Sequence, residues 1–331
     1  METQSPKDFD EGMPDVGDGH SIYWRAQGPR EAPVMLVVHG GPGGAMNVKW
    51  AEVLEQDKWR VVFFDQRGCG KSTPFGLLAH NGIDALVGDM EKLRVALNVG
   101  QWALFGGSWG TTLSLAYGVT HPERCLGFLL RGVFLARRED IDWFLWDVRR
   151  VFPEAHRAFL DAIEVACGKR PASAREILQM TEAPLARFDE AGTRLARAWT
   201  QYETTLSVVN KPEKESAEEE KRKRPSAEAN AAAVSMALLE RHYMANELPP
   251  IPLLPLVARI AHLPCRIVHG RFDMVCPADQ ALALAARWPG AELAVVDAAG
   301  HWTFEPGNLA ALRAGVAALA DAIGQAKRAA T

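Results

Sequence analysis

The chain has 331 residues, of which 48 % are hydrophobic and 24 % charged, a balance typical of a globular protein long enough to bury a substantial core. Its formal net charge is −4, so it lacks the basic excess that nucleic-acid-binding proteins usually carry. Its amino terminus has neither the basic start nor the apolar stretch of a secretory signal. These features indicate a soluble protein with a small partner, and they argue against nucleic-acid binding, export and a membrane span.

Six short apolar runs are predicted to be strands of one sheet. They cover residues 34–39, 61–65, 102–105, 126–130, 266–269 and 293–297. Helix-length amphipathic segments separate them, and this alternation is typical of a parallel sheet with helices on both faces. Ligands bind at the carboxyl ends of such strands, so we expect the functional residues there.

The alternation stops between about residues 137 and 250, where the sequence becomes helical, amphipathic and rich in aromatic residues. We expect a helical cap over residues 137–252, inserted between two parts of the main domain, 1–136 and 253–331. Within the cap, residues 212–230 form a mixed-charge run of low hydrophobicity, which predicts an exposed helix or a mobile loop.

The first glycine-rich loop, HGGPGG at 39–44, follows the first long apolar run. The side chain of His39 is expected only to hold this loop. The backbone is more informative, because glycines allow an N–H group to point at a developing oxyanion. We predict that the backbone N–H groups of Gly41 and Trp109 form an oxyanion hole.

Ser108 is predicted to be a nucleophile because it lies in the pattern G-x-S-x-G. The five residues Gly106-Gly107-Ser108-Trp109-Gly110 stand between a predicted strand and a predicted helix. A serine at such a sharp turn has a strained backbone, and the flanking glycines let neighbouring chain segments approach without side-chain clashes.

A serine hydroxyl needs a base and a group that orients the base. Asp273 follows one late predicted strand and His301 follows the next, which gives the order serine, acid, histidine typical of this turn. Asp297 is the alternative acid, but it lies only four residues before His301, at the end of the preceding strand. We favour Asp273 as the acid and interpret Asp297 as a structural carboxylate.

No cofactor or metal is expected. Gly70-Lys71-Ser72 resembles the end of a phosphate-binding loop, but that motif needs a glycine at position 65, where this chain has aspartate. The glycines of HGGPGG lack dinucleotide-binding spacing. The five cysteines are scattered, without a CxxC pair or a metal-ligand cluster, which predicts reduced thiols in the cytoplasm.

With these motifs in view, the chain resembles the prolyl iminopeptidases, serine peptidases that release an N-terminal proline. The resemblance runs from about residue 34 to residue 307. Its matching strings include HGGPGG, FDQRGCGKSTP, GGSWGTTLSLAY, ERHY and VHGRFDMVCP. It implies the α/β-hydrolase fold, a triad of Ser108, Asp273 and His301, and small peptides with a free N-terminal proline as substrates.

The resemblance also implies a site for the substrate's α-ammonium group. Glu203 and Glu240 look like the family's two cap glutamates, and Arg131 looks like its arginine; buried carboxylates are natural partners of a cationic amine. The positions that resemble the lining of the proline pocket are Phe134, Phe144, Met244 and Cys276.

The pocket departs from the family pattern. The family often has an aromatic residue where this chain has Met244, and a tyrosine where it has Phe144. The pocket is therefore expected to differ in size and polarity. A carboxylesterase or amidase acting on neutral substrates is the alternative function. The paired glutamates favour the aminopeptidase, because a neutral substrate gives buried carboxylates no compensating charge. A non-enzymatic binding role is the third possibility, and the intact triad argues against it.

Overall fold

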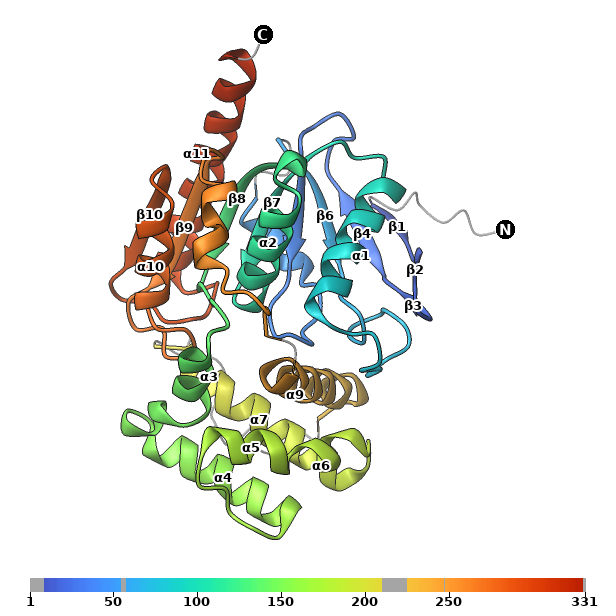
Figure 1. The fold of residues 1–331 in the computed structure, drawn as a ribbon, viewed down its shortest axis with the longest axis vertical. Helices are drawn as coiled ribbons and strands as arrows, with labels where there is room; N and C mark the ends of the chain where they lie inside the picture. Colours follow the sequence, from blue (N-terminus) through green and yellow to red (C-terminus); the bar gives the residue numbers. More distant parts are fainter. Residues whose placement is uncertain (1–8, 55–57, 210–224, 247, 330–331) are drawn as a thin grey trace.

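The computed structural model describes residues 9–54, 58–209, 225–246 and 248–329. Its centre is an eight-stranded sheet with the strand order β1-β4-β6-β5-β7-β8-β9-β10 (Figure 1). Strands β5 to β10 run parallel, whereas β4 is antiparallel to β6 and β1 to β4. The bounds are β1 Asp10–Gly12, β4 Trp24–Gln27, β5 Val34–Val38, β6 Arg60–Phe64, β7 Trp102–Gly107, β8 Cys125–Arg131, β9 Cys265–Gly270 and β10 Ala291–Val296.

The six predicted strands are confirmed as β5 to β10, with ends that differ by at most two residues. The amino-terminal strands were not predicted. Besides β1 and β4, they include a small hairpin of β2 (Asp15–Gly17) and β3 (His20–Ser21). These strands have at most four residues each and include polar or charged ones, so they lack the longer apolar run that marks a strand buried on both faces.

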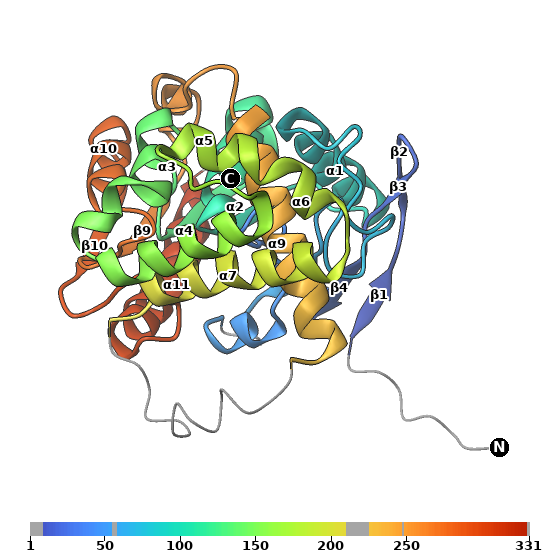
Figure 2. The same ribbon diagram turned by 90° about the horizontal axis from the view of Figure 1, so that it is seen from below.

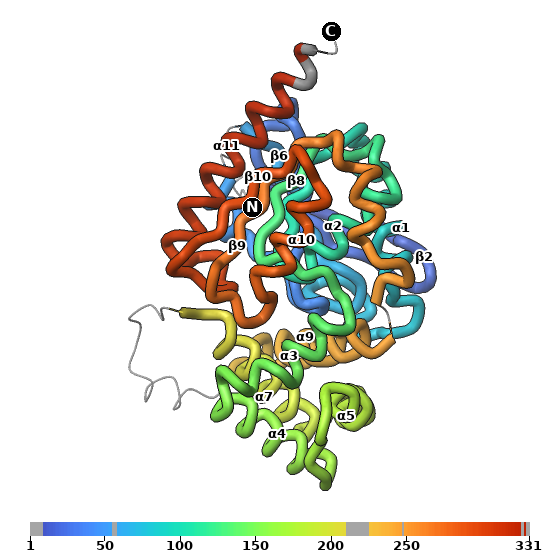
Figure 3. Tube along the Cα trace, turned by 60° about the vertical axis from the view of Figure 1, so that its left-hand side comes forward, coloured from blue at the N-terminus to red at the C-terminus, as the bar shows by residue number. Residues whose placement is uncertain are grey.

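The sheet is covered on both faces, and β5 shows how one strand serves both. Leu36 and Val38 belong to the apolar cluster that includes residues of α1 (Ile83–Ala96), α2 (Trp109–Thr120) and α10 (Asp279–Arg287). Met35 and Val37 belong to the cluster on the other face, against α11 (Pro306–Ala329). The tube in Figure 3 shows α11 on the opposite side of the strands from α1 and α2.

The described residues between β8 and β9 are mainly helical, and these helices cover one end of the core (Figures 1 and 2). They are α3 Arg138–Leu145, α4 Pro153–Cys167, α5 Ala174–Met180, α6 Glu182–Ala186, α7 Glu190–Ser207 and α9 Ala227–Asn246. Short 3₁₀ helices span Val48–Glu52, Pro122–Arg124, Asp147–Arg150 and Leu254–Arg259. We call the helices α3 to α9 the cap; its limits at residues 137 and 252 stay a prediction.

Local sequence explains where the cap helices begin and end. Asp189 begins α7 by accepting a hydrogen bond from the N–H of Gly192, and Ser173 caps α5 in the same way. Helix α4 ends at Gly168, which has φ 74°. Of the charged run 212–230, residues 212–224 lie outside the described residues, and its last four begin α9.

No helix in the described part of the chain is both long enough and apolar enough to cross a bilayer. All five cysteines are free thiols, four of them buried.

Candidate active site

Ser108 lies at the turn between β7 and α2, with φ 56° and ψ −127°. A positive φ is uncommon for a residue with a side chain. Its neighbours hold it there: the N–H of Ser108 donates to the backbone oxygen of Arg131 over 3.1 Å. A Cβ at Gly110 would lie 2.0 Å from the carbonyl oxygen of Val38, and one at Gly106 would lie 2.5 Å from that of Gly110. Both predicted glycines are therefore required by close backbone approach.

His301, in the loop between β10 and α11, is hydrogen-bonded to Asp273, which follows β9. The distance from His301 Nδ1 to Asp273 Oδ2 is 2.6 Å, and the two residues are 7 % and 2 % exposed. The alternative acid, Asp297, has a side chain that is 82 % exposed and is paired with Arg271 at 2.6 Å. The carboxylate that orients the imidazole is therefore that of Asp273.

The surroundings of Asp273 keep its carboxylate charged. Burial acts to raise its pKa, but the charge and hydrogen bond of His301 outweigh burial, and the pKa is lowered below its usual value. Its Oδ1 accepts the N–H groups of Val275 and Cys276 at 3.1 and 2.8 Å. An ionised Asp273 holds a proton on Nδ1 of His301, which leaves Nε2 free to act as a base.

His269 is a positioning residue that the sequence analysis missed. Its Nδ1 accepts the N–H of Val133 at 3.0 Å, so its Nε2 carries the proton and donates to the carbonyl oxygen of Cys276 at 2.7 Å. Burial lowers the pKa of His269, which keeps the ring neutral. It thereby joins the end of β8 to the loop of Asp273. Its place at the carboxyl end of β9 was the available signal.

The two halves of the site meet through Arg131. Its backbone oxygen accepts from Ser108, and its Nη1 donates to the backbone oxygen of His301 over 2.6 Å. The next residue, Gly132, lies so close to His301 that a Cβ there would be 2.9 Å from the ring carbon Cε1. The hydrogen bonds found among the described residues do not include one from Ser108 Oγ to His301. Such bonds are often long in unliganded enzymes and shorten when substrate binds.

The HGGPGG loop lies directly beside Ser108. A Cβ on Gly40 would be 3.1 Å from that of Ser108, and Gly41 has φ 114°, a conformation that favours glycine. The N–H of Trp109 is the first of α2, so it has no acceptor within the helix. The backbones of Gly41 and Trp109 are therefore both adjacent to the serine.

Gln66 connects these two backbone segments, a role that the sequence analysis did not assign. Its Nε2 donates to the carbonyl oxygen of His39 at 2.9 Å, and its Oε1 accepts the indole N–H of Trp109 at 3.1 Å. As expected, the His39 side chain holds the loop, because its Nε2 accepts the N–H of Gln66 at 3.1 Å. The string FDQRG, in which Gln66 lies, was the signal.

A small cavity opens beside Ser108. It brings together both predicted glutamates and all four residues predicted to line the pocket, and adds Val275. The lining residues are Gly41, Ser108, Phe134, Phe144, Glu203, Glu240, Met244, Val275 and Cys276.

The two glutamates come from different cap helices, Glu203 from α7 and Glu240 from α9. Glu240 is 1 % exposed, and its Oε2 accepts the indole N–H of Trp199 at 2.5 Å. Burial, together with the charge of Glu203, raises the pKa of Glu240 well above its usual value. Burial also raises the pKa of Glu203, to about 7, against the opposing effect of the Arg131 charge. Two buried carboxylates of like charge are costly unless a cation joins them.

Arg131 does not line this cavity, although the resemblance groups it with the amine-binding residues. It is buried, with its guanidinium beside Gly107 and 5.4 Å from the ring centroid of Trp50. Its charge still acts on Glu203. A direct contact between Arg131 and a substrate therefore stays a prediction, and its contribution to the charge balance is the better supported role.

A larger groove lies at the amino ends of the strands, on the opposite edge of the sheet. Its arginines, Arg30 and Arg60, both pair with Asp10, and Glu31 adds a second negative charge, so the charges of its lining balance. Over the described ranges, no group of three histidine, cysteine, aspartate or glutamate residues could hold a metal ion.

Comparison with known proteins identifies the family. The family model described as the alpha/beta hydrolase fold matches residues 33–307. The chain is 40 % identical to the proline iminopeptidase of Xylella fastidiosa over 311 residues, which cover 92 % of this chain and 94 % of that protein. It is also 40 % identical to a probable proline iminopeptidase of Leptolyngbya boryana, covering 92 % of both. The chain belongs to the proline iminopeptidase family.

Solved structures agree with this family at the level of the fold. The proline iminopeptidase of Mycobacterium smegmatis aligns with a TM-score of 0.59 at 18 % identity, covering 97 % of this chain and 100 % of that one. An esterase of Exiguobacterium antarcticum aligns with a TM-score of 0.61 at 17 % identity, covering 91 % and 96 %. This proline iminopeptidase family member is therefore a hydrolase with the α/β-hydrolase fold, as the sequence predicts.

Proposed function

We propose that the protein is a serine aminopeptidase that releases an N-terminal proline from small peptides through an acyl-enzyme on Ser108. One observation carries the proposal: the cavity beside Ser108 is lined by two carboxylates, of which Glu240 is fully buried, together with apolar side chains. A substrate that satisfies both needs a positive charge and a compact apolar body next to the bond that is cut. An N-terminal prolyl residue has both.

In the acylation step, Ser108 Oγ attacks the prolyl carbonyl carbon while Nε2 of His301 accepts the hydroxyl proton. The N–H groups of Gly41 and Trp109 donate to the carbonyl oxygen as it becomes an oxyanion. The C–N bond then breaks, and His301 gives its proton to the leaving amine. Asp273 stays ionised throughout, and it stabilises the imidazolium that forms between these two transfers.

In the second step, water attacks the prolyl ester of Ser108. His301 takes a proton from the water, and the same two N–H groups stabilise the second oxyanion. The ester C–O bond breaks, the proton returns to Ser108 Oγ, and free proline leaves.

Glu203 and Glu240 hold the substrate's α-ammonium group in this proposal. A bound ammonium would lower the pKa of both carboxylates and relieve their mutual repulsion. Arg131 supplies a positive charge from outside the cavity, which offsets part of the charge of Glu203 before substrate binds. In this proposal the side chains of the pocket surround the pyrrolidine ring; they are Phe134, Phe144, Met244 and Cys276.

An esterase or amidase acting on neutral substrates is the second candidate, and the fold alone permits it. The glutamate pair counts against it, because a neutral substrate would leave the carboxylates buried without a counter-charge. We place the activity in the cytoplasm, which is consistent with five free thiols.

The test is the ratio of kcat/KM for prolyl-naphthylamide to kcat/KM for its N-acetyl counterpart. Hydrogen bonds to charged groups contribute roughly 1.5–3 kcal/mol each, so losing two should reduce the rate by about two to four decades. Glu203→Gln and Glu240→Gln should lower this ratio while scarcely changing hydrolysis of a neutral acetate ester. A ratio near one in the wild-type enzyme would favour the esterase.

A further inference from the structure

The loop that carries His301 is held on two sides by different parts of the chain. Its carbonyl groups are held from the core: Asn308 Nδ2 donates to the oxygens of Gly300 and Trp302 at 3.0 and 2.9 Å, and Arg131 donates to that of His301. Its N–H groups face the cap instead. The N–H of Trp302 donates to the backbone oxygen of Ser207, the last residue of α7, at 2.9 Å.

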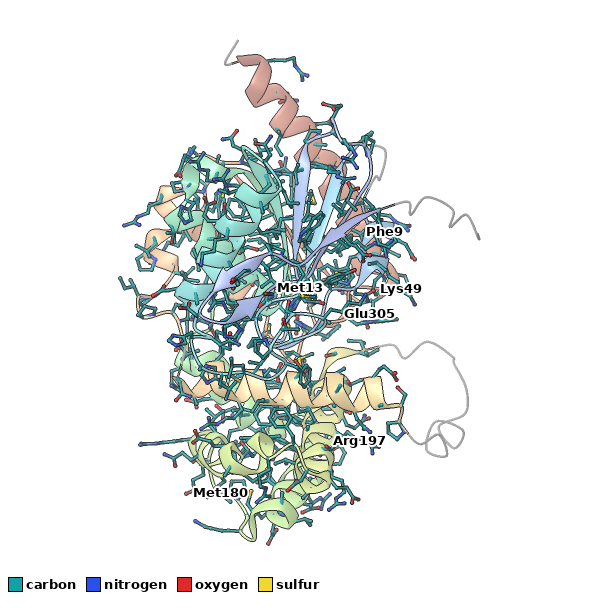
Figure 4. All side chains as sticks on the ribbon, turned by 90° about the vertical axis from the view of Figure 1, so that its right-hand side faces the viewer. Phe9, Met13, Lys49, Met180, Arg197 and Glu305 are labelled. Carbon is teal, nitrogen blue, oxygen red and sulfur yellow. The ribbon has the colours of Figure 1, made fainter. Side chains whose placement is uncertain are left out.

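Glu305 makes the second contact of this kind. Its Oε2 accepts the N–H of Gly300 at 2.5 Å, and its Oε1 accepts the N–H of Val209 at 2.9 Å. Gly300 immediately precedes His301, and Val209 lies just beyond α7. Glu305 is 1 % exposed, and Figure 4 shows it where the core meets the cap helices. One buried carboxylate thus joins the histidine loop to the cap.

The two segments touch without any spacer. A Cβ on Gly300 would lie 2.9 Å from the backbone oxygen of Ser207 and 3.1 Å from a methyl group of Val209. The hydroxyl of Ser207 in turn donates to the backbone oxygen of Glu203 at 2.8 Å, so this contact continues into the turn of α7 that carries Glu203. A displacement of the end of α7 would therefore move the peptide groups on either side of His301.

We propose that Glu305 is a positioning residue, which fastens the loop of His301 to the cap segment after α7 and so holds the base in line with Ser108. This inference rests on the role proposed above for His301, but not on the identity of the substrate. Through this connection, the helix that carries Glu203 and the catalytic histidine keep a fixed relative position.

This connection requires a side chain with two acceptor oxygens. A carboxylate presents two acceptor oxygens, and here each one meets a backbone N–H. Glutamine has nearly the same shape but replaces one oxygen with an NH₂ group, which would face one of the two N–H donors. The variant Glu305→Gln therefore breaks the hydrogen bond to Gly300 or the one to Val209, and it fills the same volume.

The experiment compares three variants in the full-length chain. Glu305→Gln changes the carboxylate. Val209→Pro removes the N–H that Glu305 accepts on the cap side and replaces the side chain beside Gly300 with another apolar one. The preceding residue, Val208, is extended at φ −121° and ψ 125°, which suits a residue before proline. Asp297→Asn is the matched control, because it changes an exposed carboxylate on the other side of His301.

We expect Glu305→Gln to lower kcat by about 10²-fold on prolyl-naphthylamide and on a neutral acetate ester, with KM changed by less than about threefold, because a misplaced base slows the chemical step. Val209→Pro should lower kcat in the same direction, and Asp297→Asn should leave it unchanged. In the double variant Glu305→Gln/Val209→Pro, the fold-loss in kcat should be smaller than the product of the two single fold-losses, because both substitutions disrupt the same connection.

Two results would overturn the proposal. One is a Glu305→Gln enzyme with a lower Tm but wild-type kcat per folded molecule, which would make the residue purely structural. The other is a double variant whose losses multiply. If Glu305→Gln fails to fold, wild-type kcat in Val209→Pro would also refute it. Full activity in His301→Ala would instead refute the role of His301, and this separates the two failures.

Discussion

Arg131 joins the proposed nucleophile and base by two hydrogen bonds: it accepts from the N–H of Ser108 over 3.1 Å and donates to the backbone oxygen of His301 over 2.6 Å. The first bond is made by the backbone oxygen of Arg131, so a substitution of Arg131 preserves it unless the main chain moves. The second uses the guanidinium. The side chain of Arg131 can therefore be changed to test the second bond alone.

Arg131→Met should lower kcat by about tenfold or more, because His301 loses a charged donor on its backbone and shifts. The change also removes the charge that holds down the pKa of Glu203, so that pKa should rise further. The acid side of the kcat/KM profile for a free-amine substrate should then move to higher pH. Steady-state kinetics across pH would reveal both effects, and an unshifted profile would show that Arg131 and Glu203 are not coupled.

Ser108→Ala and His301→Ala should each remove nearly all turnover. The Tm of Ser108→Ala should stay close to that of the wild type, whereas His301→Ala removes the partner of the buried Asp273 carboxylate and should lower the Tm. The measurement is hydrolysis of prolyl-naphthylamide and of an acetate ester, together with a thermal melt. Retained activity in either variant would exclude the proposed triad.

Asp273→Asn should lower kcat by several orders of magnitude, about 10⁴-fold, because an amide favours the wrong tautomer of the histidine. Asp297→Asn is the control, since its carboxylate is exposed and paired with Arg271. It should retain wild-type kinetics. If Asp297→Asn were the damaging change, the acid would have been assigned to the wrong residue.

The pH dependence of binding follows from the glutamate pair. Below pH about 7, Glu203 takes up a proton and loses the charge that attracts an ammonium group. Above about 7.7–8.0, a free α-amine loses its own charge. The value of 1/KM for a prolyl substrate should therefore be largest between these limits. A neutral ester should show no loss on the alkaline side, and equal alkaline losses for the two substrates would contradict amine recognition.

Glu240→Gln should make the unliganded protein more stable. The pKa of Glu240 is raised on folding, so above pH about 4.5 the unfolded chain releases this proton more readily than the native protein does. This difference lowers the free energy of unfolding at neutral pH. Glutamine does not titrate, so the substitution removes this penalty, and the glutamine oxygen can still accept the indole N–H of Trp199. We therefore expect the free energy of unfolding to be higher than that of the wild type at pH 7 and unchanged below pH 4. Denaturant titrations at both pH values measure it; a destabilised variant at pH 7 would contradict it.

Sequence patterns predicted the parts of the fold in which neighbouring residues share the same surroundings, such as burial on both faces of the sheet. Strands β5 to β10 are buried on both faces, so their apolar runs are continuous, whereas β1 to β4 are short and charged and gave no such signal. The role of Gly106 and Gly110 could also be predicted, because the sharp turn at Ser108 brings other backbone atoms too close for side chains at these positions.

The remaining parts of the site depend on partners far apart in the chain. Asp273 and Asp297 both follow a strand, and only their positions around His301 distinguish them. Glu305 looks like an ordinary acidic residue before a helix until its bond to Val209, 96 residues away, is visible. Local patterns contain no information on such pairs.

The insertion of the cap has a consequence for the order in which the active site can be built. Ser108 and Arg131 precede the cap, whereas Asp273 and His301 follow it, and the bond from Arg131 to His301 closes a loop of 170 residues. Contacts of such long range form late, and a chain leaving the ribosome has its proposed nucleophile well before its proposed base. On the proposed mechanism, the nascent protein is therefore inert toward other peptides until its last strand and α11 are in place.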